Sequence, residues 1–348
     1  MGLRGKGAKP MKKRDADAPP PSSEPLPWDA PGLTPAERVI LFCESLPVTS
    51  GALAGTQFRL RDWQKRFLES VYAVDANGRR RVRTAVLSVA RKNGKTDLIA
   101  RLALCHVAGP MAEARGEAFS CANDRFQASR IHREMVAIIE RVQWLSERVS
   151  IVRHSKELED FGGTGTTFAA LSSDVATKHG LSPSFCVYDE MGQSATRELY
   201  DVMDSAMGAR AEPLMIVIST QAARDDAPMS ELIDYGLRLQ TGEIKDATFH
   251  LELFTAPAED DPWSPATWRK ANPALGDFRS LEDVERLAAQ AQRMPSREAS
   301  FRNLILNQRV DATAQFLSAA VWKECAGKVE ETKLAGRPCF AGLDLGAT

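Results

Sequence analysis

Gly94, Lys95 and Thr96 lie at the junction between an apolar strand and an apolar helix, within the stretch VLSVARKNGKTDLIA (86–100). Unpaired amide groups at a helix N-terminus attract anions, and a lysine and a hydroxyl there suit the phosphates and Mg²⁺ of a nucleotide. The three residues therefore predict an ATP–Mg²⁺ site, with an ordinary strand-to-helix turn as the alternative. The loop departs from the G-x-x-x-x-G-K-[ST] pattern, because Val89 stands at the first glycine.

A pair of acidic residues follows a second apolar strand further along the chain. Asp189 and Glu190 come directly after Phe185–Tyr188. In a nucleotide-hydrolysing site, Asp189 would bind the metal through water, and Glu190 would orient and deprotonate the attacking water. A solvated acid pair at a strand end is the alternative, but it does not explain the apolar strand that leads into it. Together the two motifs predict an ATPase.

The elements that must position these motifs alternate between strand and helix. Apolar runs predict strands at 83–90, 117–122, 183–190 and 212–222, helices at 34–46, 61–73, 97–108 and 125–147, and a hairpin at 161–172. Strands that are almost continuously apolar are typical of a parallel sheet that is buried on both faces. We therefore expect an α/β fold of the P-loop ATPase type, with a mostly parallel sheet covered by helices on both faces.

The composition of the chain changes along its length. Residues 1–30 are basic and proline-rich and predict a disordered tail, with a contact to DNA phosphates or to a partner as the alternative. Residues 31–225 predict the ATPase core. Residues 226–330 predict a small helical linker subdomain, in which Ser280 and Asp283 begin one helix. A further apolar strand begins at 339.

Composition limits the class of protein. The 348 residues carry a formal net charge of −1, which argues against coating nucleic acid by bulk positive charge but allows a local basic channel. The basic turn Arg79–Arg83 could touch DNA phosphates, although such runs are more often solvated. Six scattered cysteines predict reduced, buried thiols, as in a cytosolic protein. No apolar run is long enough for a membrane span, so we expect no membrane partner.

Over residues 33–348 the sequence resembles the large terminase subunits of tailed double-stranded DNA phages. Arg91 falls on the arginine of that family's deviant phosphate loop. The other matching segments are GTQFRLRDWQKRFL (55–68), ANDRFQA (122–128), KHGLSPSFCVYDE (178–190), Ser219-Thr220-Gln221, WRKANPALGD (268–277), MPSREASFRNLILNQRV (294–310) and GLDLGAT (342–348). Each motif is weak alone, and their order makes the resemblance specific.

The resemblance implies roles for particular residues. Arg91 would stabilise charge on the γ-phosphate in the transition state, with a surface ion pair as the alternative, and Gln64 would lie beside adenine. Asp344 would be the first metal ligand of an RNase H-like nuclease domain that begins near residue 331. The full expected nucleotide-binding set is Gln64, Arg91, Lys92, Asn93, Gly94, Lys95 and Thr96; Thr96 and Asp189 would hold Mg²⁺, and Ser219, Thr220 and Gln221 would couple hydrolysis to DNA movement.

The resemblance also implies a function, namely an ATP-driven motor that translocates double-stranded DNA into a procapsid. The expected partners are DNA, a portal protein, a small terminase subunit and further copies in a ring, in the host cytoplasm. Because only four residues follow Asp344, we expect nuclease activity to be absent. The alternatives are a helicase-like DNA translocase and a docking module without catalysis.

Overall fold

The computed structural model describes residues 26–51, 53–172 and 180–310, together with isolated positions 327, 336 and 338. The chain divides into two units after Asp311, and all but three of the described residues lie in the larger one. Three of the predicted features lie outside the described residues: the basic tail up to residue 25, the end of the linker, and the strand with Asp344. The tail also ends earlier than predicted, because Trp28 in the short helix η1 (Pro27–Asp29) is 4% exposed and packs on Phe42.

The larger unit is built on an eight-stranded sheet with the order β3-β4-β5-β2-β6-β7-β1-β8. The pairs from β5 to β8 are parallel, whereas β3-β4-β5 form an antiparallel edge. The strands are β1 (Thr84–Ser88), β2 (Glu117–Ala122), β3 (Ser150–Val152), β4 (Glu157–Glu159), β5 (Thr167–Ser172), β6 (Pro183–Asp189), β7 (Leu214–Ser219) and β8 (Phe249–Leu253). The predicted hairpin is the β4–β5 pair, and the predicted mostly parallel sheet is confirmed.

Each central strand sends alternate side chains into two different cores, because successive residues of a strand face opposite sides of a sheet. On β1, Ala85 and Leu87 join one core and Val86 joins the other; on β6, Phe185 and Val187 are separated in the same way from Cys186. This two-sided burial explains why these strands are almost continuously apolar in sequence.

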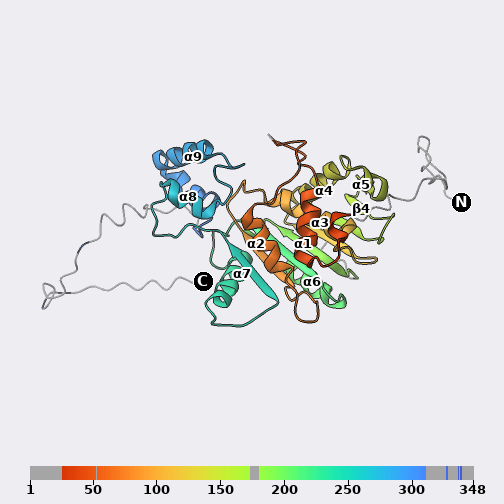
Figure 1. The fold of residues 1–348 in the computed structure, drawn as a ribbon. Coiled ribbons are helices and arrows are strands. Elements are labelled where there is room, and N and C mark those ends of the chain that lie inside the picture. The colour runs from red at the N-terminus through yellow and green to blue at the C-terminus, as the bar shows by residue number, and fades with distance from the viewer. Residues whose placement is uncertain are drawn as a thin grey trace, which may run out of the picture. The chain divides into compact units, whose positions relative to one another are not determined.

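Helices cover both faces of the sheet, as predicted (Figure 1). The larger core is formed with α1 (Pro35–Ser45), α2 (Asp62–Val71), α3 (Lys95–Ala108), α4 (Arg125–Ile139) and α5 (Gln143–Arg148); the smaller core is formed with η3 (Met191–Gln193), α6 (Glu198–Ala206), η4 (Met207–Ala209) and α7 (Pro228–Gln240). The predicted start of α1 is confirmed, since Thr34 and Glu37 form a reciprocal capping box. No helix among the described residues is long and apolar enough to cross a membrane.

Two predicted elements differ from the structure. The helix predicted over 125–147 is interrupted at Val142, whose extended backbone separates α4 from α5. Strand β8 was not predicted, and it pairs with β1 in parallel. The sheet therefore extends beyond the predicted boundary at residue 225, and the connecting helix α7 packs on the same sheet.

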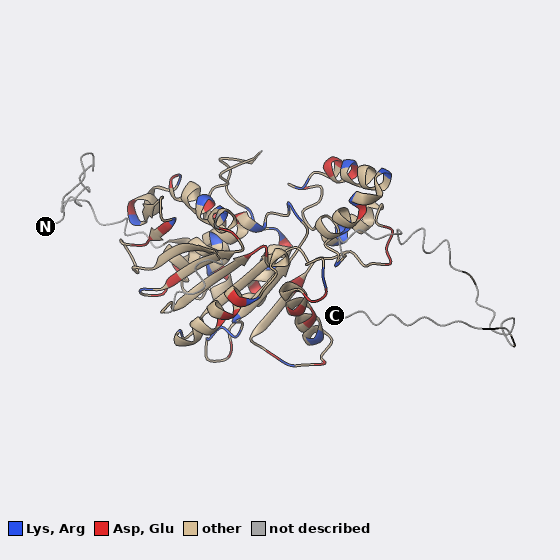
Figure 2. Cartoon of the chain, turned by 180° about the vertical axis from the view of Figure 1, so that it is seen from behind, with Lys and Arg blue, Asp and Glu red and all other residues tan. Residues whose placement is uncertain are grey.

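A group of short helices follows β8 and has a small core of its own. We call residues 256–309 the helical lobe; it contains α8 (Pro265–Ala271), α9 (Leu281–Arg293), η5 (Pro295–Arg297) and α10 (Glu298–Leu304). Its core contains Trp268, Val284 and Phe301, and Ser280 caps α9 as predicted. Figure 2 shows acidic and basic residues side by side along α9, in keeping with the nearly neutral charge of the chain.

Candidate active site

The phosphate loop connects the end of β1 to the start of α3, as predicted. Its backbone turns through left-handed conformations at Lys92 (φ 68°) and Gly94 (φ 77°). Glycine is favoured at 94 for two reasons: the left-handed φ is disfavoured for most other residues, and a Cβ there would lie 3.1 Å from the ring of Phe278, which would have to shift slightly. Gly94, the second glycine of the nucleotide-binding pattern, therefore has a structural role in this loop.

The first half of the loop is bonded to other parts of the protein. The amide groups of Val89, Ala90 and Arg91 donate to the carbonyl oxygens of Ser219 (3.2 Å), Ala271 (3.4 Å) and Leu304 (3.0 Å), respectively. Val89 is itself buried in the larger core. Val89, which replaces the first glycine of the pattern, is thus a core residue whose amide is already bonded. Only the later amides of the loop remain available to bind an anion.

Lys95 is the most strongly perturbed cation of the loop. Its side chain is buried, and Nζ donates to the carbonyl oxygens of Val89 (2.7 Å) and Ala90 (3.3 Å). Burial lowers the pKa of Lys95 to about 8, although the charges of Glu190 and Asp189 act in the opposite direction. A poorly solvated ammonium at a helix start favours binding of an anion.

The acid pair lies at the end of β6, next to this lysine. Asp189 is 3% exposed; burial, and then the charge of Glu190, raise its pKa to about 7, while Lys95 lowers it. Glu190 has a left-handed backbone (φ 57°), and its amide donates to Ile218 O at 2.8 Å. A non-glycine residue in that conformation is strained, and such strain is common at functional sites.

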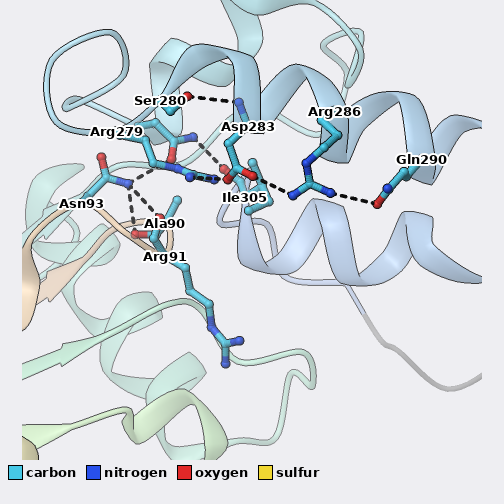
Figure 3. A network of polar contacts seen from close by, with 10 residues as sticks. Ala90, Arg91, Asn93, Arg279, Ser280, Asp283, Arg286, Gln290 and Ile305 are labelled. Carbon is cyan, nitrogen blue, oxygen red and sulfur yellow. Dashed lines mark hydrogen bonds and ion pairs between the residues drawn. The ribbon is translucent and has the colours of Figure 1, made fainter. Parts of the chain in front are cut away.

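A cavity of about 990 Å³ joins these elements. The predicted site residues that line it are Gln64, Arg91, Lys92, Gly94, Lys95, Thr96 and Glu190. Within the described part of the chain, the Arg91 guanidinium has no hydrogen bond or ion pair, and in Figure 3 it points away from the neighbouring polar network. The surface ion pair considered for Arg91 is therefore not formed by the described residues. Asp189 lies behind Glu190 and is not among the lining residues.

The side chain of Asn93 does not face the cavity. It is fully buried, and its Nδ2 donates to Ala90 O (3.1 Å) within its own loop (Figure 3). Nδ2 also donates to Asn272 Oδ1 (2.9 Å), and Oδ1 accepts from the amide of Ala274 (3.1 Å). The predicted place of Asn93 in the nucleotide-binding set stays a prediction that could involve only its backbone, because its side chain is directed into the protein. That side chain connects the phosphate loop to the helical lobe.

Gln64 also differs from the exposed helix residue that its pattern alone suggests. It is 1% exposed, and its Oε1 accepts from the amide of Arg61 at 2.9 Å. The carbonyl oxygen of the Gln64 side chain thus caps α2, and its NH₂ group remains available to a ligand in the cavity. The placement beside a nucleotide base stays a prediction.

The predicted coupling residues connect the acid pair to the lobe. Ser219 Oγ accepts from the amide of Gly192, just after the acid pair, at 2.8 Å. Gln221 donates its amide to Asn307 Oδ1 (2.7 Å), and Asn303 donates to Gln221 O (3.0 Å). Thr220 is buried between them. These contacts provide a physical path from the acid pair to the lobe, while the coupling role itself stays a prediction.

The cavity is also lined by residues for which no role was predicted, among them Arg61, Arg130, Asp277 and Phe278. The charge of Arg130 lowers the pKa of Asp189, against the larger effect of burial. Asp277 lies in a segment that the sequence analysis had matched to the family, but nothing in the local pattern indicates that this segment folds back onto the phosphate loop.

A second cavity, of about 830 Å³, lies away from these motifs. It is lined by Thr84 and Phe249, the first residues of β1 and β8, so it is at the opposite ends of those strands from the phosphate loop. Two of its charged residues, Arg197 and Glu231, pair with each other. None of the predicted site residues lines it.

Two other predictions can be compared with the structure. In the basic turn, the guanidinium of Arg80 donates to the carbonyl oxygens of Val82, Glu212 and Pro213, so this arginine supports the turn rather than extending into solvent. The four cysteines in the described residues, Cys43, Cys105, Cys121 and Cys186, are free and buried, as predicted.

The fold and the site define a class of protein. The model of the terminase large subunit ATPase domain family matches residues 62–238, a stretch that contains both the phosphate loop and the acid pair. The chain belongs to this family.

Individual relatives support the same assignment. The large subunit of the terminase from Enterobacteria phage HK97 is 39% identical over 318 residues, which are 90% of this chain and 60% of that protein. The crystal structure of the HK97 large terminase superposes with a TM-score of 0.73 over 84% of this chain and 59% of that one. Protein YmfN of Escherichia coli (strain K12) is 27% identical over 167 residues, which are 48% of this chain and 37% of YmfN. The chain thus spans about three fifths of the length of the HK97 relative.

Proposed function

We propose that this protein binds and hydrolyses ATP at the cavity between the phosphate loop and the acid pair. The observation that carries the proposal is the convergence of Lys95, Arg91 and Glu190 on one cavity from the ends of β1 and β6, two parallel strands that are separated by β7. Lys95 and Arg91 supply positive charge for the phosphates. Glu190 orients the attacking water and accepts its proton.

The residues present fit a magnesium ion that arrives with the nucleotide. The Thr96 hydroxyl would hold it directly and the Asp189 carboxylate through a water molecule, since oxygen atoms are the ligands that Mg²⁺ prefers. Mg²⁺ in nucleotide sites is usually bound by one or two protein side chains, substrate phosphates and water. Burial raises the pKa of Asp189, and a bound cation would compensate the charge of its carboxylate. Bound Mg²⁺ would neutralise charge on the phosphates.

We further propose that hydrolysis drives movement of double-stranded DNA into a procapsid, as the family relationship suggests. The portal protein, a small terminase subunit and further copies of this chain in a ring would be the partners, in the cytoplasm of the host. The contacts of Ser219 with Gly192 and of Gln221 with Asn307 support the proposal, because they connect the acid pair to the helical lobe. A change at the nucleotide could thereby alter the position of the lobe.

Steady-state ATP turnover, measured with and without linear duplex DNA, tests the proposal. We expect turnover in the wild-type protein, an increase with DNA, and loss of both in Lys95→Ala. Lys65→Ala is the matched control, because Lys65 lies on α2 and its ammonium pairs with Glu44. Turnover that survived Lys95→Ala would contradict the assignment of the site, and turnover that ignored DNA would contradict the motor.

A further inference from the structure

One end of the cavity is formed by two segments that are far apart in the sequence. Arg61 and Gln64 come from the start of α2, and Asp277 and Phe278 come from the loop between α8 and α9 in the helical lobe. The phosphate-binding residues Lys95 and Thr96 line the same cavity. If the phosphates of a nucleotide lie at the start of α3, its base and its sugar must contact other walls of the same cavity.

Arg61 and Phe278 are stacked on each other. The Arg61 guanidinium carbon lies 4.8 Å from the centre of the Phe278 ring. Asp277 holds the guanidinium through two hydrogen bonds, from Nε (2.6 Å) and from Nη2 (3.0 Å). These bonds with Arg61 are the main reason that the pKa of Asp277 is lowered. A bidentate pair of this kind fixes the plane of the guanidinium.

The position of Phe278 is fixed relative to the phosphate loop. Its ring edge lies against Gly94, where an added Cβ would be 3.1 Å from Cζ. The backbone four residues earlier is held by the bond from the Ala274 amide to Asn93 Oδ1. The ring is nevertheless 37% exposed, which is unusual for a phenylalanine in a segment that is otherwise bonded to the core. An aromatic face held in place and left open to a cavity is a surface for a planar ligand.

We propose that the stacked Arg61–Phe278 pair is the platform for the base of the bound nucleotide, and that Asp277 positions Arg61 within it. Nucleobases stack favourably on aromatic rings and on arginine guanidinium planes. The NH₂ group of Gln64, which lines the same cavity, then faces the polar edge of the base. This inference rests on the proposed ATP site, and it adds that the helical lobe contributes a binding residue to that site.

Binding of ATP and of inorganic tripolyphosphate to the full chain tests the platform. Tripolyphosphate has the phosphates of ATP but no base. We expect Phe278→Ala and Phe278→Leu to weaken ATP binding by about tenfold, in the range typical of one base stack, and to leave tripolyphosphate binding unchanged. Phe161→Ala is the control, because Phe161 is also an exposed phenylalanine but lies in the β4–β5 turn and does not line the cavity. We expect it to change neither affinity.

A second variant gives a direct signal. Phe278→Trp keeps a planar ring, so we expect it to bind ATP as the wild type does. We also expect ATP, but not tripolyphosphate, to change the added tryptophan fluorescence. An equal loss of affinity for both ligands in Phe278→Ala and Phe278→Leu would overturn the platform and make Phe278 a support of the phosphate loop. Unchanged ATP affinity would overturn it as well. If the wild-type protein bound tripolyphosphate and ATP equally weakly, the proposed ATP site itself would fall.

Discussion

At the scale of single residues, Lys95 and Asp189 are both shifted towards their neutral forms. Burial lowers the pKa of Lys95 to about 8 and raises that of Asp189 to about 7. Both groups have lost most of their hydration through burial, and the attraction between their opposite charges offsets only part of that loss. A polyanion with its counter-ion would supply the missing compensation for both. The site is therefore suited to bind the two together.

Glu190→Gln tests the role of the acid that lines the cavity. We expect the rate of hydrolysis to fall by about 10²- to 10⁴-fold, because a general base contributes about that much. We expect ATP binding to persist, since Lys95 and the loop amides remain. Turnover and nucleotide affinity are the measurements. Glu198→Gln, an exposed acid on α6, should change neither. A Glu190→Gln protein with the wild-type rate would show that the base lies elsewhere.

Arg91→Ala tests whether the unpaired guanidinium acts mainly in the transition state. We expect kcat to fall far more than the affinity for ATP, because an interaction made only in the transition state lowers kcat without weakening ground-state binding. Arg91→Lys keeps the charge and should retain part of the rate. Equal losses in kcat and in affinity would instead make Arg91 an ordinary phosphate ligand.

At the scale of elements, the phosphate loop and the helical lobe are held together by buried polar contacts. Asn93 and Asn272 are both buried, and Asn272 also donates to Ile305 O at 2.7 Å. The pair thus joins the loop after β1 to both ends of the lobe. Buried amide networks of this kind stabilise one arrangement when every member is paired, and they are costly when one member is removed.

A double-mutant cycle measures the interaction energy between Asn93 and Asn272. We expect Asn93→Ala and Asn272→Ala each to lower the free energy of unfolding by about 2 kcal/mol, since each leaves buried partners unpaired. The double variant should lose less than the sum, with a coupling of about 0.5–3 kcal/mol. Urea denaturation gives these values. Asn93→Ala combined with Arg286→Ala, an exposed residue of α9 that bonds within its own helix, should be additive. Additive effects in the Asn93–Asn272 cycle would contradict a direct interaction between these two residues.

At the scale of the whole molecule, stability depends on histidines that are buried in the cores. His106 on α3 is stacked on Phe185 with ring centroids 4.1 Å apart, and its Nε2 pairs with Tyr72 Oη at 2.8 Å. Burial, and then the charge of Arg80, hold the pKa of His106 well below 6.5. Burial also lowers the pKa values of His132 and His250.

These shifts predict a loss of stability in acid. The unfolded chain takes up protons on these histidines near pH 6.5, whereas the folded chain does so only at lower pH. The stability that these histidines contribute is therefore complete above about pH 6.5 and falls as the pH drops below it, by up to about 1.4 kcal/mol per pH unit for buried His106. Asp189, whose pKa is raised to about 7, acts in the opposite direction over the same range, so the test is the change in slope when the histidine is removed. Urea denaturation from pH 7.5 to 5 measures the slope. His106→Gln should flatten it, whereas His154→Gln, at an exposed position, should not. An unchanged slope in His106→Gln would contradict the assignment.

Local patterns in the sequence predict the central sheet and the core of the site. Gly94-Lys95-Thr96 and Asp189-Glu190 are recognisable because each stands at the end of an apolar strand, and parallel strands bring those ends to one edge. The predicted hairpin and the capping box of α1 were also local signals. By contrast, His250 and Glu252 interrupt the apolar pattern of β8, an edge strand with one neighbour, so this strand was missed.

Contacts between distant segments could not be predicted in this way. The partners of Asn93 are Asn272 and Ala274, and neither periodicity nor composition indicates which polar side chain meets which. Trp28 was assigned to the tail for a similar reason, because proline-rich flanks conceal the aromatic contact it makes with Phe42. These contacts depend on how the whole chain folds, and the residues next to each partner in the sequence carry little information about them.

The bonds from the amides of Ala90 and Arg91 to Ala271 and Leu304 have a consequence for hydrogen exchange. A bonded amide proton exchanges with deuterium only while its bond is open. For these two amides, opening means that the helical lobe separates from the loop, even though the protons themselves belong to the loop. Their exchange rates therefore report how often the lobe detaches. A nucleotide that holds the two parts together would slow deuterium uptake at Ala90 and Arg91, and residue-resolved mass spectrometry could follow the lobe without any label.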